Sequence, residues 1–500
     1  MFPIPKLDPQ SQPDLLTLSL RELQRLIDPT AEDPHADLRA FYSTPDGIVP
    51  FVQDILGVDD VAPYQAEILR TFVEFRRIAA RGPHGLGKTA LSSWVILWAM
   101  SVFDTDVKVI CTASAWRQLR HYTFPEARKW ATRAHWHKLG MQMRRNKEIL
   151  ELSIKLRNNK EAFAVASDNE AFIEGAHASK LIYVFDEAKA IPVPTWDAAE
   201  GAFSTGDCYA LAISTPGETS GRFYDICTRK PGYEDWKTRH VKLEEAVAAG
   251  RIRQEWVDDR KKQWGEKSAV YKNRVLGEFD DSGEDNVVPL SWVEKAIERW
   301  HEKNGKGEGR VSWGVDPAYK GEDKTTIAKM VGRVVEKIEA HSKEDTIQTT
   351  GRVASQADKE SVIAVDVIGV GAGVYDQLRN QRFRVLPVNV SHKAEYQNGK
   401  PMTDVSGEIK FLNLRAAIWW MLRDALDPDG DDPLALPPSI EDKLVGDLTA
   451  PKYEYTNSGQ IKIESKDDLR ERIGRSTDYA DAVGLALYAA TRRAGPVTMV

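Results

Sequence analysis

The side chains with the most distinctive chemistry begin at Gly82, where the chain reads GPHGLGKT. This stretch fits the phosphate-loop pattern G-x-x-x-x-G-K-S/T at every fixed position. Gly82, Gly85 and Gly87 would let backbone N–H groups curl around phosphates without side-chain clashes. Lys88 would neutralise the terminal phosphates of ATP, and the Thr89 hydroxyl would ligate Mg²⁺. The alternative is a glycine-rich turn that binds nothing.

An adjacent pair of acids, Asp186 and Glu187, follows the apolar run 181–185 further along the chain. In open α/β sheets, ligands bind at the carboxyl ends of such strands. Asp186 would hold Mg²⁺ through a water molecule, and Glu187 would orient and deprotonate the water that attacks the phosphate. The alternative is a solvated acid pair at the end of a strand.

Two further segments could complete this nucleotide site. The amide of Gln65 can pair with both a donor and an acceptor on an adenine edge, and Tyr64 could stack on the ring. An ordinary helix start explains the same residues equally well. Ser214 and Thr215, at the tip of the next expected strand, could sense the γ-phosphate, although a plain strand-to-turn junction is a comparable explanation.

Four aspartates beyond residue 310 form a second candidate site. Asp316 and Asp366 each end a short apolar strand, and Asp478 and Asp481 open a helix at i, i+3 on one face. Carboxylates that converge repel one another unless divalent cations lie between them. Two bridged ions, Mg²⁺ or Mn²⁺, could activate water and stabilise the leaving oxygen of a phosphodiester. We favour Asp481 as the third ligand, because Asp478 could instead be an N-terminal helix acid. Each aspartate taken singly also fits a turn or cap.

Alternating strands and helices are expected to position the first site. Short apolar strands are expected at 76–81, 107–112, 181–185 and 209–214, with a helix at 88–100. This alternation predicts a parallel sheet covered on both faces.

A polar stretch and a glycine-rich stretch mark a junction at 281–310, with a short helix at 292–303. Beyond it we expect a second domain. Its expected strands are 311–315, 327–335, 362–366 and 385–388; its expected helices are 371–380, 412–426 and 477–492; a β-hairpin is expected at 452–463. The predicted domains are therefore 1–45, a segment with one amphipathic helix at 14–27, then 46–280, a linker at 281–310, and 311–500.

The composition constrains the class of protein. The chain has 500 residues, 42% of them hydrophobic, and a formal net charge of −7, which excludes wholesale disorder and a surface that is basic throughout. The sequence contains no run of about 18 apolar residues, so we expect no membrane span. The first residues do not resemble a secretory signal. Three scattered cysteines, Cys111, Cys208 and Cys227, predict no disulfide framework or zinc site and favour a reduced, intracellular setting.

As a set, these motifs resemble the large terminase subunit of tailed bacteriophages, the motor that packages viral DNA. The similarity extends over roughly residues 60–490. It is carried by residues 81–89, 172–177 leading into 181–187, Ser214-Thr215-Pro216, and the segment 275–279 that resembles the end of the family's ATPase domain. One departure is Ser-Thr-Pro at 214–216, where many members carry a Gly-Asn-Pro-like coupling motif. The family's arginine finger has several candidates here: Arg81, Arg117, Arg120, Arg144 and Arg145.

The resemblance implies an α/β protein with two domains. The first would be a P-loop (RecA/ASCE-like) ATPase domain with a parallel sheet, and the second an RNase H-like nuclease domain. Asp316, Asp366 and either Asp478 or Asp481 would bind metal, with Asp323 as an accessory acid. Asn413 and Arg415 match a family pattern and could touch DNA or cap a helix.

The activity implied is ATP-driven translocation of double-stranded DNA into a procapsid, together with metal-dependent cutting of concatemeric DNA. The implied partners are DNA, a small terminase subunit and a portal protein. The implied assembly is a homo-oligomeric ring, a pentamer, on the procapsid, with a monomer in solution. The implied location is the host cytoplasm and the portal. A helicase-like or repair ATPase fused to a nuclease is the alternative enzyme, and a DNA-bridging scaffold with a nucleotide switch is the alternative without catalysis.

Overall fold

The structure is a computed structural model that describes residues 33–166, 177–203, 207–217, 219–280, 285–318, 324–396 and 398–492. The chain divides into two compact units. The first unit is Met1–Arg253 with Leu276–Glu278, and the second is Gln254–Val275 with Phe279–Val500. The expected helix at 14–27 lies outside the described residues.

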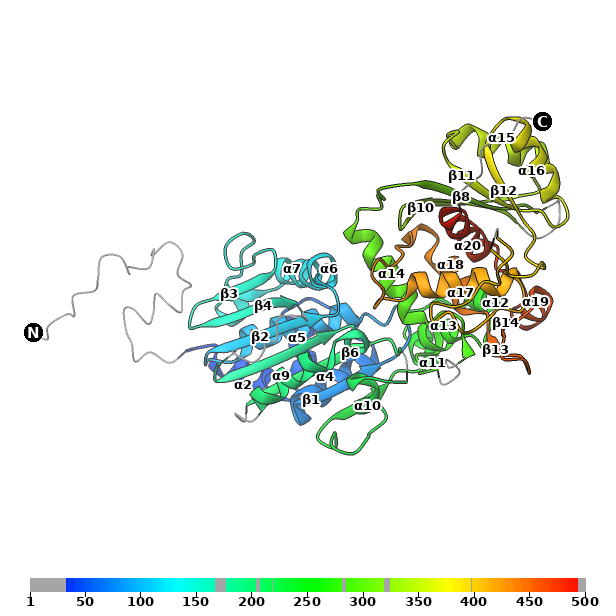
Figure 1. The fold of residues 1–500 in the computed structure, drawn as a ribbon. Helices are drawn as coiled ribbons and strands as arrows, with labels where there is room; N and C mark the ends of the chain where they lie inside the picture. Colours follow the sequence, from blue (N-terminus) through cyan, green and yellow to red (C-terminus); the bar gives the residue numbers. More distant parts are fainter. Residues whose placement is uncertain are drawn as a thin grey trace, which may run out of the picture. The chain divides into compact units, whose positions relative to one another are not determined.

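Seven strands form one sheet in the first unit (Figure 1). The strands are β1 Arg77–Arg81, β2 Val107–Ala113, β3 Ser153–Leu156, β4 Lys160–Ala166, β5 Lys180–Asp186, β6 Cys208–Ser214 and β7 Lys237–His240. They lie in the order β3-β4-β2-β5-β6-β1-β7, and only β3 and β4 pair antiparallel. All four expected strands are therefore confirmed, each within a residue or two of its predicted ends.

The position of β6 defines the type of this sheet. β6 lies between β1, which leads into the phosphate loop, and β5, which ends at Asp186. A strand inserted between these two is typical of RecA/ASCE-like nucleotide-binding sheets. The predicted fold of the first domain is confirmed by this order.

One face of the sheet is covered by α9 (Val193–Phe203). Side chains alternate along a strand, so Tyr183 and Phe185 of β5 point to the same face. Phe185 stacks on Trp196 of α9 with ring centroids 4.2 Å apart. Aromatic burial therefore fixes α9 against the strand that carries the acid pair.

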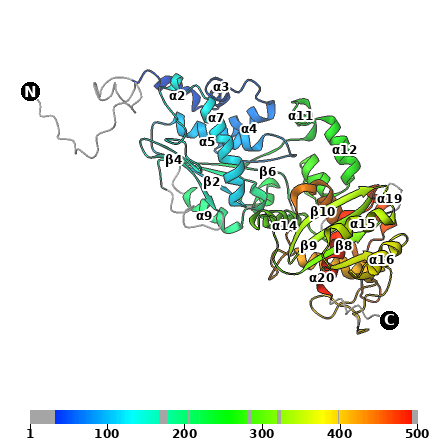
Figure 2. The ribbon, with the colours of Figure 1, turned by 90° about the horizontal axis from the view of Figure 1, so that it is seen from above.

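The opposite face is covered by α4 (Pro63–Phe75) and α5 (Lys88–Val102), as Figure 2 shows. Tyr209 of β6 points to this face, where its ring lies 5.5 Å from that of Phe72 and 6.1 Å from that of Trp98. The sheet is thus buried on both sides, as the sequence predicts. The other helices of this unit are α2 Ala36–Tyr42, α3 Ile48–Asp54, α6 Trp116–Gln118, a π-helix at Leu119–Thr123, α7 Phe124–Arg133, α10 Arg222–Cys227 and α11 Leu243–Ala248, with short 3-10 turns at Trp136–Leu139 and Ala188–Ala190.

Five strands form the main sheet of the second unit. They are β8 Val311–Asp316, β9 Lys324–Val331, β10 Val334–Ser342, β11 Val362–Asp366 and β12 Arg384–Val388. Their order is β10-β9-β8-β11-β12; β10, β9 and β8 pair antiparallel, and β8, β11 and β12 pair parallel. This arrangement is RNase H-like and confirms the fold predicted for the second domain.

One expected strand of this unit is wrong. Residues 327–335 were expected to form a single strand, but they belong to β9 and β10, which are joined by a tight turn at Gly332. Gly332 has a φ of +56°, a conformation that glycine adopts without strain. Apolar residues stand on both sides of this turn, because both strands of the hairpin contribute buried side chains.

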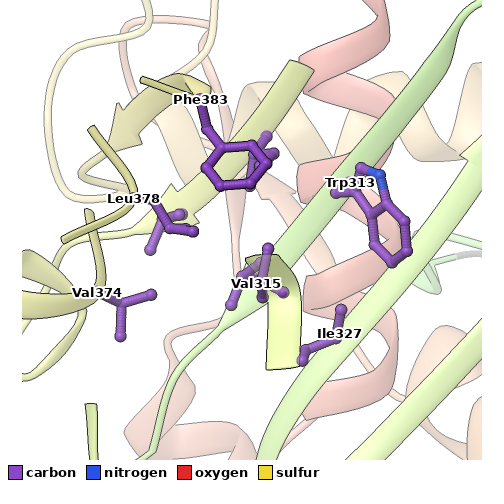
Figure 3. Close-up of a cluster of buried hydrophobic side chains, with 9 residues drawn as sticks. Trp313, Val315, Ile327, Val374, Leu378 and Phe383 are labelled. Atoms are coloured by element: carbon purple, nitrogen blue, oxygen red, sulfur yellow. The ribbon is translucent and has the colours of Figure 1, made fainter. Parts of the chain in front are cut away.

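One face of the second sheet packs on α15 (Thr346–Gln356) and α16 (Gly371–Asn380). The core of this layer contains Trp313 and Val315 of β8, together with side chains from the neighbouring strands and helices (Figure 3). The full cluster is Trp313, Val315, Ile327, Val353, Ile363, Val365, Val374, Leu378 and Phe383.

The other face packs on α20 (Asp478–Thr491). Gly314 permits this approach, because a Cβ atom there would lie 2.0 Å from the carbonyl oxygen of Ala482. The remaining elements of the unit are α12 Gln254–Trp264, α13 Ala269–Tyr271, a π-helix at Lys272–Leu276, α14 Leu290–Glu302, α17 Leu414–Leu426, a 3-10 turn at Pro438–Ile440, α18 Glu441–Thr449, α19 Lys466–Ile473, and the hairpin β13 Tyr453–Tyr455 with β14 Ile461–Ile463. Among the described residues, no helix combines the length and apolar character needed to cross a membrane.

Candidate active sites

The phosphate loop connects β1 to α5 in the first unit. Gly85 and Gly87 have φ angles of +87° and +76°, so both need the freedom of glycine. A Cβ atom on Gly87 would lie 2.8 Å from Nε2 of Gln65. The loop therefore brings the first N–H groups of α5 to the carboxyl edge of the sheet, where they can receive an anion.

Lys88 is the first residue of α5 and is 9% exposed. Its ammonium lies 3.5 Å from the carbonyl oxygen of Pro83, a long contact for a charged donor. Burial lowers the pKa of Lys88, while Glu187 and Asp186 act in the opposite direction. A buried cation at the head of this loop fits the phosphates of a bound nucleotide.

Asp186 lies at the end of β5 and is 1% exposed. It accepts hydrogen bonds from the Thr123 hydroxyl at 2.6 Å and from the Gln118 amide at 3.5 Å. Burial, and then the neighbouring Glu187, raise the pKa of Asp186 to about 6. A nearby cation would favour its ionised form, as expected of a residue that holds Mg²⁺.

Glu187 follows in a left-handed conformation with a φ of +48°. This backbone conformation is strained for a residue with a side chain, and residues with such strain are enriched at functional sites. The Ser214 hydroxyl at the tip of β6 donates to Glu187 Oε2 at 3.0 Å. The structure thus connects the acid pair to the Ser-Thr-Pro segment, a contact that the sequence did not predict.

Gln65 and Tyr64 lie beside the phosphate loop, and both are buried. The Gln65 amide and the Tyr64 hydroxyl donate to the carbonyl oxygen of Leu86, at 3.1 and 3.0 Å. Gln65 Oε1 also accepts from the backbone N–H of Ala62. In this structure both residues brace the loop from outside, and their contact with adenine stays a prediction.

The arginine-finger candidates take up different roles. Arg81 donates to the carbonyl oxygen of Gly277 at 2.7 Å and is half-buried. Arg120 and Arg144 pair with the acids Glu151 and Glu148. The other two candidates are Arg117, whose guanidinium lies over the Tyr122 ring, and Arg145, which is exposed.

The second site forms where β8, β11 and α20 meet. Side chains of β8 alternate, so Asp316 shares a face with Gly314, the residue that packs against α20. In β11, Asp366 shares a face with Ala364, which pairs with Gly314. The two carboxylates therefore emerge from adjacent parallel strands on the face that α20 covers.

Asp481 completes this group from the first turn of α20 and is 11% exposed. Its Oδ1 accepts from Arg415 Nη1 and from Trp419 Nε1, both at 3.2 Å. Its Oδ2 accepts from the Thr477 hydroxyl at 3.2 Å. α17 and the start of α20 therefore fix this carboxylate in position.

Lys466 is a site residue that the sequence analysis missed. Its ammonium lies 3.1 Å from Asp481 Oδ2 and 3.6 Å from Asp316 Oδ2. The Ser465 hydroxyl caps the start of α19, which places Lys466 in the first turn of that helix. A capping motif is visible in the sequence, but nothing in it shows that the next side chain turns toward distant acids.

Asp478 points elsewhere. Its carboxylate accepts from the Ser476 hydroxyl and, at 3.2 Å, from the backbone N–H of Lys324. The structure thus groups Asp481, and not Asp478, with Asp316 and Lys466. Asp323 lies outside the described residues.

The acids of this site have opposed pKa shifts. Burial raises the pKa of Asp316 to about 7, with Asp481 and Asp366 acting in the same direction. Burial likewise raises the pKa of Asp366. Burial would also raise the pKa of Asp481, but Lys466 and Arg415 outweigh it and hold that pKa below its usual value.

No group of three His, Cys, Asp or Glu side chains within the described part of the chain has the spacing of a metal site. At the acids of the second unit, the Lys466 ammonium takes the place that a cation would need between Asp316 and Asp481. Carboxylate oxygens are ligands that Mg²⁺ and Mn²⁺ prefer. The Lys466 ammonium shows that a positive charge is accommodated between these buried acids. The residues fit a divalent cation that displaces this ammonium.

Two family-pattern residues on α17 have separate roles. Asn413 caps the helix, since its Oδ1 accepts from the backbone N–H of Ala416 at 2.9 Å. Arg415 instead reaches Asp481. Trp419 and Trp420 are core residues, at 2% and 9% exposed, and Trp419 also donates to Asp481.

The fold and the two sites define a class of protein that joins a RecA/ASCE-like phosphate-loop domain to an RNase H-like domain. Within that class the chain is similar to the probable large terminase subunit of Enterobacteria phage P7. The two are 25% identical over 344 residues, which cover 64% of this chain and 66% of that protein. The match thus spans just under two thirds of that relative. No protein-family model matches the chain.

The chain is also similar, at low sequence identity, to solved structures of large terminases. The large terminase of a thermophilic bacteriophage covers 86% of this chain at 13% identity, with a TM-score of 0.39 over 98% of that protein. The nuclease domain of the large terminase subunit of bacterial virus Sf6 covers 40% of this chain at 22% identity, with a TM-score of 0.35 over 97% of that domain. These scores add nothing to the fold derived from strand order.

Proposed function

We propose that this chain is the motor subunit of a viral genome-packaging machine, which translocates double-stranded DNA into a procapsid with ATP and cuts concatemeric DNA. The observation that supports the proposal most is the pairing of a braced phosphate loop in one unit with convergent acids in the other. The sequence similarity to a probable large terminase subunit agrees with it.

In the ATPase centre, Gly82, Gly85 and Gly87 would wrap the phosphates with backbone N–H groups, and Lys88 would carry their charge. Thr89 and Asp186 would hold Mg²⁺, which offsets charge on the phosphates. The Glu187 carboxylate would hold the attacking water and take its proton. Ser214 would fix the second oxygen of that carboxylate, so the rest of β6 is connected to the state of the nucleotide.

In the nuclease centre, Asp316, Asp366 and Asp481 would hold Mg²⁺ or Mn²⁺, whose chemistry is to activate water and stabilise the leaving oxygen of a phosphodiester. Arg415 and Trp419 keep Asp481 oriented for this purpose. The Lys466 ammonium would keep the Asp481 carboxylate ionised before a cation arrives.

The proposed substrate is double-stranded DNA of any sequence, gripped through its phosphates. The proposed partners are a small terminase subunit and a portal protein. The proposed assembly is a pentameric ring on the procapsid, whereas the free protein in solution would be a monomer. The proposed location is the host cytoplasm. The domain boundaries at 46–280 and 311–500 belong to this proposal, and they differ from the compact units in that Gln254–Val275 groups with the second unit.

The ATPase assignment is tested with Lys88→Ala and Glu187→Gln. We expect both variants to lose ATP hydrolysis by about 100-fold or more, since a positioned base and a phosphate-binding cation are each removed. DNA cutting should remain measurable in both. Phosphate release at the wild-type rate in either variant would remove the assignment.

The nuclease assignment is tested with Asp366→Asn, and with Asp376→Asn as a control because Asp376 is an exposed acid on α16. We expect Asp366→Asn to lose Mg²⁺- or Mn²⁺-dependent nicking of plasmid DNA and to keep ATP hydrolysis. The control should keep both. Nicking by Asp366→Asn at the wild-type rate would contradict the assignment.

A helicase-like or repair ATPase is not favoured. Such an enzyme needs a second RecA-like sheet or strand-separating elements, whereas the second unit has an RNase H-like sheet. Displacement of a labelled strand from a partial duplex, driven by ATP, would favour that alternative.

A further inference from the structure

A basic cavity lies in the second unit beside the proposed nuclease centre. Its volume is about 550 Å³, and its wall is built from α12, α18, α19, the start of β9 and the start of α20. Four cationic side chains line it against one carboxylate. They are Lys324, Lys443, Arg470 and Arg475, with Asp478 as the carboxylate.

Two of these cations have no acidic partner among the described residues. Lys324 and Lys443 make no ion pair with any residue that the structure describes, whereas many lysines of this chain do, such as Lys272 with Asp280 and Lys329 with Glu336. The ammonium of Lys443 lies 5.8 Å from the centre of the Tyr479 ring. Unpaired positive charge gathered around a hollow is the electrostatic pattern of an anion site.

The wall behind these lysines is held by contacts within the protein. Arg475 pairs with Asp447, which is fully buried and also accepts from the backbone N–H of Tyr479 at 3.0 Å. Arg475 Nη1 donates to the carbonyl oxygen of Ser476 at 3.0 Å. The charge of Arg475 is thus balanced within the protein, and its role is to hold the turn that leads into α20.

The cavity and the nuclease centre share the first turn of α20. Asp478 lines the cavity, and Asp481, one turn further on, belongs to the acid group. The backbone N–H of Lys324 donates to Asp478, which connects β9 to the same turn. The cavity and the acid group are therefore lined by residues that lie one helical turn apart on α20.

We propose that this cavity binds the phosphodiester backbone of the DNA strand next to the bond that is cut, with Lys324, Lys443 and Arg470 as its phosphate contacts. This inference rests on the proposed nuclease function. The cavity positions the strand and reads no sequence, because phosphate contacts fix register without contacting base edges.

The test is DNA binding as a function of salt by Lys324→Ala/Lys443→Ala in the full chain. The probe is a fluorescent 30-base-pair duplex of mixed sequence, measured by anisotropy between 50 and 200 mM KCl without divalent ions. We expect the slope of log K against log salt to fall by about 1.8, since each lost contact to duplex DNA removes about 0.9. At 0.1 M salt, binding should weaken by about 10-fold or more. The ATPase rate should not change.

The control variant is Lys337→Ala, which removes an exposed lysine of β10 in the same unit. We expect it to leave the slope unchanged. A second variant, Lys324→Arg/Lys443→Arg, keeps both charges and should restore most of the slope, which excludes damage to the fold as the cause.

Three results would overturn the inference. One is an unchanged slope in the double alanine variant, with wild-type protein binding and cutting normally; the proposed function would then survive. Another is a double alanine variant that binds DNA as the wild type does but no longer binds inorganic phosphate, as measured by phosphorus NMR. That result would make the cavity a site for a free anion. Wild-type protein that neither binds nor cuts duplex DNA would overturn the proposed function itself.

Discussion

Replacement of Gly314 by alanine tests how the fold of the second unit positions its acids. A Cβ atom at residue 314 would lie 2.0 Å from the carbonyl oxygen of Ala482, 2.4 Å from the backbone nitrogen of Ala486 and 2.9 Å from Cβ of Leu485. The two closest atoms are backbone, so no side-chain rotation can relieve the contact. Helix α20 must therefore move away from β8 by about 1.5 Å to reach ordinary van der Waals distances.

The expected cost is about 1–3 kcal/mol of unfolding free energy, the usual range when a packed core is forced apart. For a unit of this size that corresponds to a melting temperature lower by about 2–12 °C. Asp481 precedes Ala482 on the helix that moves, so its distance to Asp316 must change. DNA cutting should fall severalfold while ATP hydrolysis stays at the wild-type rate.

The matched control is Gly351→Ala. Gly351 lies within α15 of the same unit, and a Cβ atom there would meet nothing within 4 Å. Alanine should stabilise that helix by about 0.5–1 kcal/mol and leave cutting unchanged. Calorimetry of both variants, with cutting and ATPase assays on the same samples, gives the comparison. A Gly314→Ala protein as stable and as active as Gly351→Ala would refute the packing argument.

Three further outcomes are expected. Ser214→Ala should lower the rate of ATP hydrolysis by about 10-fold with little change in nucleotide affinity, because Glu187 loses the donor that orients it. An unchanged rate would show that Ser214 does not orient the Glu187 carboxylate for catalysis. Lys466→Met should lower the stability of the second unit by about 1 kcal/mol without divalent ions, since Asp481 loses a partly exposed cation, and Mn²⁺ should restore it in thermal unfolding; no loss, or no rescue, would count against the fit of a cation there. DNA cutting at limiting metal concentration should rise as the pH increases through about 7, because the raised pKa leaves Asp316 largely protonated at lower pH and a metal ligand must be ionised; a rate that is flat between pH 5.5 and 7.5 would contradict this.

Local sequence patterns predicted much of the fold. The phosphate loop and the acid pair were recognised because each follows an apolar strand at a fixed spacing. The alternation of strands and helices predicted a parallel sheet covered on both faces, and Tyr183 and Tyr209 now show how its two faces divide. The sequence did not predict the hairpin of β9 and β10, because only Gly332 and Arg333 separate the apolar ends of the two strands.

The sequence could not predict contacts between distant segments. Lys466 approaches Asp316 across 150 residues of sequence, and the Ser214 hydroxyl meets Glu187 only because β5 and β6 are neighbours. The choice between Asp478 and Asp481 depended on which way the first turn of α20 faces. These facts follow from packing, which periodicity and motif spacing do not encode.

The most direct test of two separate phosphate-handling centres is a crystal structure with ATPγS and Mn²⁺, located by its anomalous scattering. The account predicts one Mn²⁺ position beside Thr89 and Asp186 at the nucleotide. It predicts a separate position or pair of positions among Asp316, Asp366 and Asp481, with the Lys466 ammonium displaced. Full nucleotide density together with no Mn²⁺ at the acids, and Lys466 still in place at saturating metal, would contradict the account.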